Sequence, residues 1–129
     1  MCTVLAYFGT DLSREEFETY LARTQERGPD DSKTVVLPQG GFLGFQRLAI
    51  MGLSPEGMQP FQLGNSWAIC NGELYGFRRM KQELEEKGYS FQSGSDCELI
   101  LPLYREYGTD LFRRLDAEFA CVIYDGEEK

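Results

Sequence analysis

Short apolar runs that end at turn-forming residues alternate along this chain with segments of helical periodicity. Runs of this length, closed by glycine, proline, asparagine or aspartate, are typical of buried β-strands. We expect strands over residues 2–8, 34–37, 42–50, 66–70, 89–92 and 119–124. Strands and helices mixed within 129 residues predict a single α+β domain that is long enough to bury a core.

Two of the expected helices begin with the spacing of a capping box, in which a serine lies three residues before a glutamate. Ser13 and Glu16 form one such pair, and Ser95 and Glu98 form the other. Apolar residues spaced by three or four follow each pair, as in an amphipathic helix. We expect helices over residues 13–26, 77–87, 95–108 and 111–115. Pro102 falls inside the third helix, where it requires either a kink or a later helix start.

Glycine and proline mark the connections between these segments. Residues 27–31 predict a loop, residues 38–41 predict the turn of a hairpin, and residues 51–60 predict an irregular connection. The dipeptide Asp125-Gly126 is a hairpin signal after the last strand, yet only three residues follow it. We therefore expect the chain to be a fragment whose fold is incomplete at the C-terminus, because native sheets avoid an unpaired edge.

The charge of the chain excludes several classes of partner. Its formal net charge is −8, so its surface repels nucleic-acid backbones and anionic membranes. The sequence has no apolar run long enough to span a bilayer and no signal peptide. We therefore expect no nucleic-acid partner, no membrane partner and a cytoplasmic location.

The chain contains four cysteines and no histidine. The cysteines lack C-x-x-C spacing, so a zinc site is not expected and no metal ligand is assigned. Cys70 and Cys121 lie in apolar runs and are interpreted as reduced core residues.

Cys2 differs from the other cysteines because it follows the initiator methionine directly. Removal of that methionine would leave a residue that carries both a thiol and a free α-amine. A thiolate nucleophile needs a base, and the α-amine, with a pKa of about 7.7–8.0, titrates near neutrality. Cys2 is therefore the natural candidate for a nucleophile, and the alternative is a small residue that opens a buried strand.

Three further groups could hold a ligand, and each has a simpler alternative. Arg47 lies in an otherwise apolar strand, where its guanidinium needs either a carboxylate ligand or an intramolecular ion pair. Asn71 and Gly72 end a strand, where they could stabilise an oxyanion or form an ordinary turn. Glu73 and Asp96 could bind an ammonium group, or serve as a solvated loop charge and a helix N-terminal residue. Together these groups complement an α-amino acid that carries a side-chain amide.

The same residues carry a resemblance to a known family. The chain resembles the N-terminal glutaminase domain of glutamine-hydrolysing asparagine synthetases, which are class II, or N-terminal nucleophile (Ntn), glutamine amidotransferases. The matching motifs cover nearly the whole chain and are Met1-Cys2, Arg27-Gly28-Pro29-Asp30-Asp31, Leu43-Gly44 with Arg47-Leu48-Ala49-Ile50, Gln59-Pro60, Asn71-Gly72-Glu73-Leu74-Tyr75, Ser95-Asp96 with Glu98, and Phe119-Ala120 with Tyr124-Asp125.

The resemblance implies a role for each candidate residue. Cys2 would attack the side-chain amide of glutamine, with its own α-amine as the base, and form a γ-glutamyl thioester while ammonia leaves. Asn71 and the N–H group of Gly72 would form the oxyanion hole. The substrate-binding residues would be Arg47 at the α-carboxylate, Glu73 and Asp96 at the α-ammonium, and the main chain near Ile50.

The resemblance also implies the fold and the partners. The fold would be an Ntn-hydrolase-like four-layer α/β/β/α sandwich with antiparallel sheets, of which residues 1–129 form the N-terminal part. Ammonia would pass to a C-terminal synthetase domain, absent from this chain, that uses ATP and magnesium to make asparagine from aspartate. The chain itself would need no cofactor.

Two other hypotheses stay open at this point. A retained Met1 or a truncated domain would leave a catalytically silent module that binds an amino acid without turning it over. An unpaired last strand would let the chain act as an interaction module, or pair with a second copy as a homodimer.

Overall fold

The expected hairpin around residues 38–41 forms and supplies two strands of the first sheet. The structure is a computed structural model that describes residues 2–50 and 53–127. β2 (Asp31–Val36) pairs antiparallel with β3 (Phe42–Arg47), and β1 (Thr3–Tyr7) pairs antiparallel with the other edge of β3. Every residue of β3 is buried, so this central strand faces protein on both sides.

The second sheet is built around β5 (Ser66–Leu74), with β4 (Phe61–Leu63) on one edge and β6 (Ala117–Asp125) on the other. Both pairings are antiparallel. The short strand β4 was not among the expected elements. Three residues are too few for the alternating pattern that reveals a strand in a sequence.

The prediction that the strand beginning near Ser66 ends at Cys70 is wrong. β5 continues through Asn71 and Gly72 to Leu74. The extra residues pair with β6, which lies 43 to 49 positions further along the chain, from Asn71 opposite Ala120 to Leu74 opposite Ala117. A local Asn-Gly turn signal is overridden because this distant strand satisfies the backbone groups that a turn would have satisfied.

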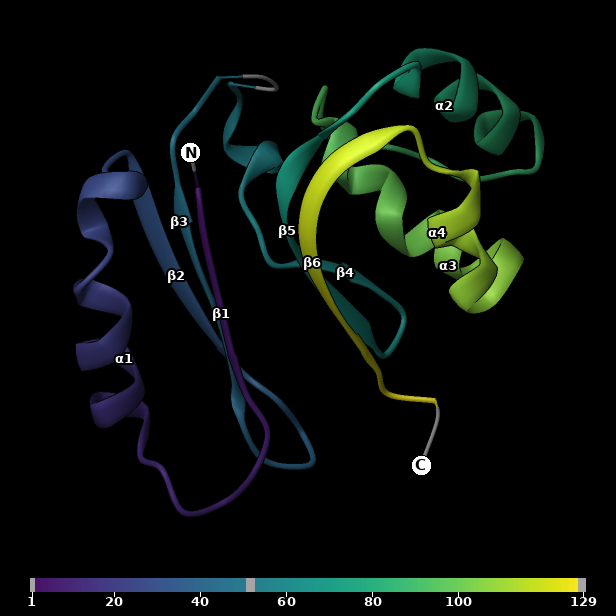
Figure 1. The fold of residues 1–129 in the computed structure, drawn as a ribbon. Helices are drawn as coiled ribbons and strands as arrows, with labels where there is room; N and C mark the ends of the chain where they lie inside the picture. Colours follow the sequence, from purple (N-terminus) through teal and green to yellow (C-terminus); the bar gives the residue numbers. More distant parts are fainter. Residues whose placement is uncertain (1, 51–52, 128–129) are drawn as a thin grey trace.

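Four helices complete the fold, and they are α1 (Arg14–Ala22), α2 (Phe77–Glu86), α3 (Ile100–Tyr107) and α4 (Leu111–Arg114). Single 3₁₀ turns lie at Gln25–Arg27, Pro55–Gly57, Asp96–Leu99 and Gly108–Asp110. Figure 1 shows α1 on the outer face of the first sheet, and α2, α3 and α4 on the outer face of the second. The expected α/β/β/α order of layers with antiparallel sheets is therefore confirmed.

The serine N-cap of the first expected capping box forms, and that of the second does not. Ser13 Oγ accepts a hydrogen bond from the Glu16 N–H group at 3.1 Å and starts α1, which ends at Ala22, earlier than expected. In the second case the Glu98 carboxylate accepts hydrogen bonds from the N–H groups of Gln92 and Ser93 instead.

This use of Glu98 explains two further differences from the sequence expectation. The strand expected at 89–92 does not form, because the Gln92 N–H group is bonded to a side chain and not to a neighbouring strand. The long helix starts late, at Ile100. Pro102 then lies in its first turn, where the missing N–H group of proline costs no hydrogen bond.

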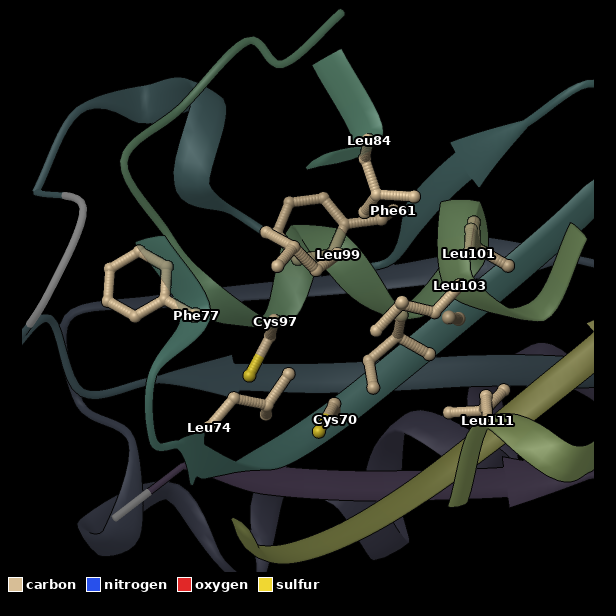
Figure 2. Packing of buried hydrophobic residues seen from close by; sticks show 12 residues of the cluster. Phe61, Cys70, Leu74, Phe77, Leu84, Cys97, Leu99, Leu101, Leu103 and Leu111 are labelled. Atoms are coloured by element: carbon tan, nitrogen blue, oxygen red, sulfur yellow. The ribbon is translucent and has the colours of Figure 1, made fainter. Parts of the chain in front are cut away.

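Three buried clusters hold the four layers together. Phe17, Leu21 and Phe42 fill the space between α1 and the first sheet, and a second cluster that includes Leu43 and Ile69 lies between the two sheets. The third and largest cluster joins β5 to the helices on its other face (Figure 2). β5 is therefore fixed by packing on both of its faces.

The first sheet and α1 approach closely at Gly44. A β-carbon at this position would lie 2.9 Å from a ring carbon of Phe17 and 3.0 Å from a methyl carbon of Leu21, both of which are buried. The glycine is thus the reason that the helix can lie this near to the sheet.

No helix within residues 2–50 and 53–127 combines the length and the apolar content that a membrane-spanning helix needs.

The close approach at Gly44 leads to a stability prediction. Gly44→Ala should lower the free energy of unfolding by about 1–3 kcal/mol, because the added methyl group overpacks a filled core. Chemical denaturation followed by circular dichroism measures the change. Lys33→Ala, an exposed change on β2, is the control and should shift stability by less than about 0.5 kcal/mol. A Gly44→Ala protein as stable as the parent would contradict the close packing of α1 on the first sheet at Gly44.

Candidate active site

One pocket of about 330 Å³ opens where the end of β3 and the start of the chain meet β5. Its lining includes the three candidate catalytic residues Cys2, Asn71 and Gly72. Its lining also includes the four candidate substrate-binding residues Arg47, Ile50, Glu73 and Asp96. Residues from four separate parts of the sequence are thus brought to one cavity.

The two faces of β5 contribute different parts of the site. Side chains alternate along a strand, and Ile69 lies in the cluster between the sheets whereas Cys70 and Leu74 lie in the cluster beneath the helices. Asn71 and Glu73 therefore share the face of Ile69 and point toward the first sheet. Asn71 reaches the pocket from the same layer in which Cys2 packs.

The edge of β5 that faces β4 supplies a second set of groups. In an antiparallel sheet the N–H and C=O groups of every second residue point to the same edge. Phe61 of β4 pairs with Ala68. Two residues on, the Gln59 side chain accepts from the Cys70 N–H group at 2.7 Å and donates to its carbonyl at 3.0 Å. The next residue with this orientation is Gly72.

At Gly72 the edge opens into the pocket. The carbonyl of Gly72 accepts a hydrogen bond from the Cys97 thiol, with 3.7 Å between sulfur and oxygen. The following group on this edge, the Leu74 N–H, donates to Asp96 Oδ2 at 2.8 Å. The Gly72 N–H group therefore lies between two filled positions of the edge and faces the pocket, which is the orientation that an oxyanion-hole donor requires.

Gly72 also allows the backbones of β5 and β6 to approach each other. A β-carbon on Gly72 would lie 2.4 Å from the Glu118 carbonyl oxygen, which is closer than any real contact. The residue is thus required inside a strand, and the alternative of an ordinary turn is wrong for Asn71 and Gly72.

Cys2 lies beside the segment that follows β3. Its sulfur accepts from the Leu48 N–H group at 3.3 Å and lies 3.6 Å from the Leu48 carbonyl oxygen, to which the thiol donates. The side chain is half-buried and borders the pocket. This placement keeps the thiol at the cavity wall, within reach of a ligand.

Arg47 is the last residue of β3 and is only 7% exposed. Its Nη1 donates to the Ser54 carbonyl at 2.9 Å, and the residue has further interactions. The loop expected at 27–31 supports this region, because Asp30 donates its N–H group to the Arg47 carbonyl at 2.9 Å and accepts at Oδ2 from the Ala49 N–H group at 2.8 Å. Hydrogen bonds thus fix both the main chain around Arg47 and its guanidinium group at the pocket wall.

Asp96 is 5% exposed, and both of its carboxylate oxygens accept hydrogen bonds from backbone N–H groups, from Cys97 at 2.9 Å and from Leu74 at 2.8 Å. Glu73 is exposed and lies directly opposite Glu118 in the β5–β6 ladder. Glu118 borders the pocket as well. Ile50 is 75% exposed and sits at the pocket rim.

The carboxylates give this end of the pocket a negative character. The charge of Glu118 is the largest cause that raises the pKa of the nearby Tyr75, followed by desolvation and by the charge of Glu73. Like charges placed opposite each other on neighbouring strands are unfavourable. A cationic group bound between Glu73, Asp96 and Glu118 would relieve this repulsion.

A group of three thiols adjoins the site, and two of them, Cys70 and Cys97, border the pocket. Cys70 lies opposite Cys121, and hydrogen bonds to Cys121 and Cys97 together with burial raise the pKa of Cys70. The same contact with Cys70 lowers the pKa of Cys121, against the effect of burial. All three are free thiols, and Cys70 is buried in the core as expected, whereas Cys121 is only partly buried against it.

Several pocket residues were not assigned a role from the sequence, among them Gln59, Cys97 and Glu118. Gln59 appeared only as part of a motif, and Glu118 gave no signal at all. In the part of the chain that the structure describes, no group of three or more histidine, cysteine, aspartate or glutamate side chains could hold a metal ion.

Comparison with known proteins tests the family directly. The family model described as "Glutamine amidotransferase domain" matches residues 1–129. The chain belongs to this family. The glutamine amidotransferase domain is also similar to curated proteins that are much longer than it is.

Three relatives illustrate the range of this similarity. A probable asparagine synthetase [glutamine-hydrolyzing] of Acanthamoeba polyphaga mimivirus is 39% identical over 97% of this chain and 24% of the relative. Asparagine synthetase B [glutamine-hydrolyzing] of Escherichia coli is 33% identical over 99% of this chain and 24% of the relative. Amidase chry2 of Gibberella zeae is 40% identical over 86% of this chain and 17% of the relative. The chain thus spans about a quarter of the length of the asparagine synthetases that it matches.

The contacts of Asp96 in this glutamine amidotransferase domain lead to a stability prediction. Asp96→Asn should lower the free energy of unfolding by about 1–3 kcal/mol, because the amide can accept from only one of the two N–H groups on Leu74 and Cys97. Asp116→Asn makes the same charge change at an exposed position and should have little effect. Denaturant unfolding measures both, and equal stabilities for the two variants would contradict the bracing role of Asp96.

Proposed function

We propose that this domain hydrolyses the side-chain amide of glutamine to glutamate and ammonia. The observation that carries the proposal is the shared pocket, in which a thiol, a buried arginine, a strand-edge N–H group and a set of carboxylates converge. These are the groups needed to bind both ends of an α-amino acid and to attack an amide. The family and the relatives named above support the same chemistry.

In the first step, the Cys2 thiol attacks the amide carbon of glutamine. Once Met1 is removed, the α-amine of Cys2 accepts the thiol proton while the new S–C bond forms and the carbonyl π electrons move to oxygen. Asn71 and the Gly72 N–H group donate hydrogen bonds to this oxyanion. A neighbouring pair of donors placed before the reaction stabilises the charge without reorganisation.

In the second step, the tetrahedral intermediate collapses. The C–N bond breaks, the α-ammonium of Cys2 returns its proton to the leaving nitrogen, and ammonia departs to leave a γ-glutamyl thioester. Water then adds to the thioester, with the amine again as the base. The C–S bond breaks, glutamate is released and the thiol is restored.

Substrate binding would use the two charged ends of the pocket. The guanidinium of Arg47 would hold the α-carboxylate of glutamine, because its planar fork matches two carboxylate oxygens. Asp96 and Glu73 would hold the α-ammonium. Ile50 would contribute main-chain contacts at the rim.

The whole protein would use the ammonia in a second reaction. We infer that a C-terminal synthetase domain takes up the ammonia and makes asparagine from aspartate, as the names of the longer relatives suggest. ATP and magnesium would act in that second domain.

The nucleophile proposal predicts the behaviour of a Cys2 variant. With Met1 removed, Cys2→Ala should abolish glutamate formation while glutamine still binds, because the charged ends of the substrate contact other residues. Glutamate release and calorimetric titration with glutamine measure the two effects. Cys121→Ala removes a thiol that lies outside the pocket lining and should keep most of the activity. Intact mass confirms that Met1 is absent, and a correctly processed parent that binds glutamine without turnover would favour the silent binding module.

The carboxylate-binding role of Arg47 predicts a separate effect on substrate affinity. Arg47→Lys should raise KM about 10- to 100-fold and change kcat less, because an ammonium group replaces a two-point contact with a point charge. Steady-state kinetics with glutamine measures the split. Arg79→Lys, an exposed position on α2, is the matched control. An unchanged KM in Arg47→Lys would contradict the assignment.

A further inference from the structure

Gln59 is a buried polar residue at the pocket for which the proposed function has no role. It is 4% exposed, and it borders the same cavity as the candidate nucleophile Cys2. Both polar atoms of its side chain are used, and both bind the main chain of a single residue. Oε1 accepts from the Cys70 N–H group at 2.7 Å, and Nε2 donates to the Cys70 carbonyl at 3.0 Å.

The position of Gln59 explains this pairing. β4 and β5 pair with Phe61 opposite Ala68, so the next position along the same edge would place residue 59 opposite residue 70. The main-chain pairing of β4 stops at Phe61, and the side-chain amide of Gln59 takes its place. A primary amide presents one donor and one acceptor, as a peptide group does. Gln59 therefore extends the ladder by one step without a backbone strand.

The step that Gln59 fills is the last one before the pocket. Cys70 directly precedes Asn71, and the next group on this edge of β5 is the Gly72 N–H, which faces the cavity. If the Cys70 backbone moved, both proposed oxyanion donors would move with it. A backbone extension of β4 by four residues, to position 57, would instead close the edge at Gly72.

We propose that Gln59 is a positioning residue for the oxyanion hole: it fixes the Cys70 backbone so that the Asn71 amide and the Gly72 N–H group stay aimed at one oxygen. This inference rests on the proposed glutaminase function. Donors act strongly on a transition state only when they are held in place before the reaction, and a displacement of about 1 Å can cost about 100-fold in rate. Gln59 acts through β5 and does not need to touch the substrate.

The first test separates oxyanion stabilisation from substrate binding. Gln59→Leu keeps the approximate size of the side chain and removes both hydrogen bonds. In the whole protein with Met1 removed, it should lower kcat about 10- to 100-fold and leave KM within about twofold. Gln62→Leu is the matched control, because Gln62 is an exposed residue on β4 that binds the Gly64 carbonyl at 3.0 Å.

Two ligands make the same test at equilibrium. The first ligand is the γ-aldehyde of glutamate, to whose carbonyl carbon the Cys2 thiol adds. An S–C bond forms, the thiol proton passes to the carbonyl oxygen, and this oxygen occupies the oxyanion hole. Glutamate binds through its charged ends without this addition. Gln59→Leu should weaken the aldehyde by about the same factor as kcat and leave the glutamate Kd within about twofold. A purely structural defect would weaken both ligands or reduce the fraction of binding-competent protein.

A second variant, Gln59→Glu, tests the hydrogen bond that Gln59 Nε2 donates. It also provides a test if Gln59→Leu fails to fold. Gln59→Glu keeps an acceptor for the Cys70 N–H group, but its ionised form turns a second oxygen toward the Cys70 carbonyl. Protonation restores a donor with nearly the original shape. Burial and this repulsion raise the carboxyl pKa above the ordinary value of about 4.3. The ratio of kcat in Gln59→Glu to kcat in the parent should therefore rise as the pH falls, whereas Gln62→Glu should give a flat ratio.

The results separate the two proposals. A processed parent that does not hydrolyse glutamine overturns the proposed function, and the role of Gln59 falls with it. An active parent with an unchanged kcat in Gln59→Leu, equal losses for aldehyde and glutamate, or a flat pH ratio for Gln59→Glu overturns the positioning role alone. Selective loss of kcat and aldehyde affinity, with the pH-dependent recovery, supports it.

Discussion

The site depends on how β5 divides its backbone hydrogen bonds between its two edges. One edge pairs with β6 along the full length of β5. The other edge pairs with three different partners in turn: the backbone of β4 at Ala68, the side chain of Gln59 at Cys70, and the carboxylate of Asp96 at Leu74. The pocket occupies the position between the last two. Between these two positions the Gly72 carbonyl accepts from the Cys97 thiol, whereas the Gly72 N–H group faces the cavity.

The packing of β5 keeps this gap in a fixed place. Cys70 and Leu74 are buried against α2, α3 and neighbouring side chains in the largest core cluster (Figure 2), and Ile69 is buried against the first sheet. Asn71 and Glu73, which share the Ile69 face, therefore point toward the start of the chain. A strand packed on both faces is a rigid support, and rigid supports hold donor groups in the geometry that a reaction needs.

The first sheet contributes the other half of the pocket through its ends. Cys2 precedes β1, and Arg47 closes β3. These two strands are antiparallel neighbours, so the thiol and the guanidinium lie at the same end of the sheet. The backbone contacts from Asp30 to Arg47 and Ala49 fix the chain where it leaves this edge. The negative end of the pocket comes from the second sheet, so a bound zwitterion would span both sheets.

The sequence alone determined the features that depend on neighbouring residues. Strand and helix patterns, the Ser13 cap and the turn at 38–41 follow from periodicity and from contacts within a few residues. Pro102 left either a kink or a late helix start, and the structure shows the late start. The candidate site residues were also named from the sequence, by residue chemistry and family resemblance.

Only the tertiary structure decided that Asn71 and Gly72 lie inside a strand, that Glu98 binds the 92–93 backbone, and that Gln59 completes a ladder. Those outcomes depend on segments 5 to 49 positions apart, such as Ser93 with Glu98, Gln59 with Cys70, and Asn71 with Ala120. No local pattern encodes such pairings, because a hydrogen bond forms with whichever partner the packed layers bring into reach.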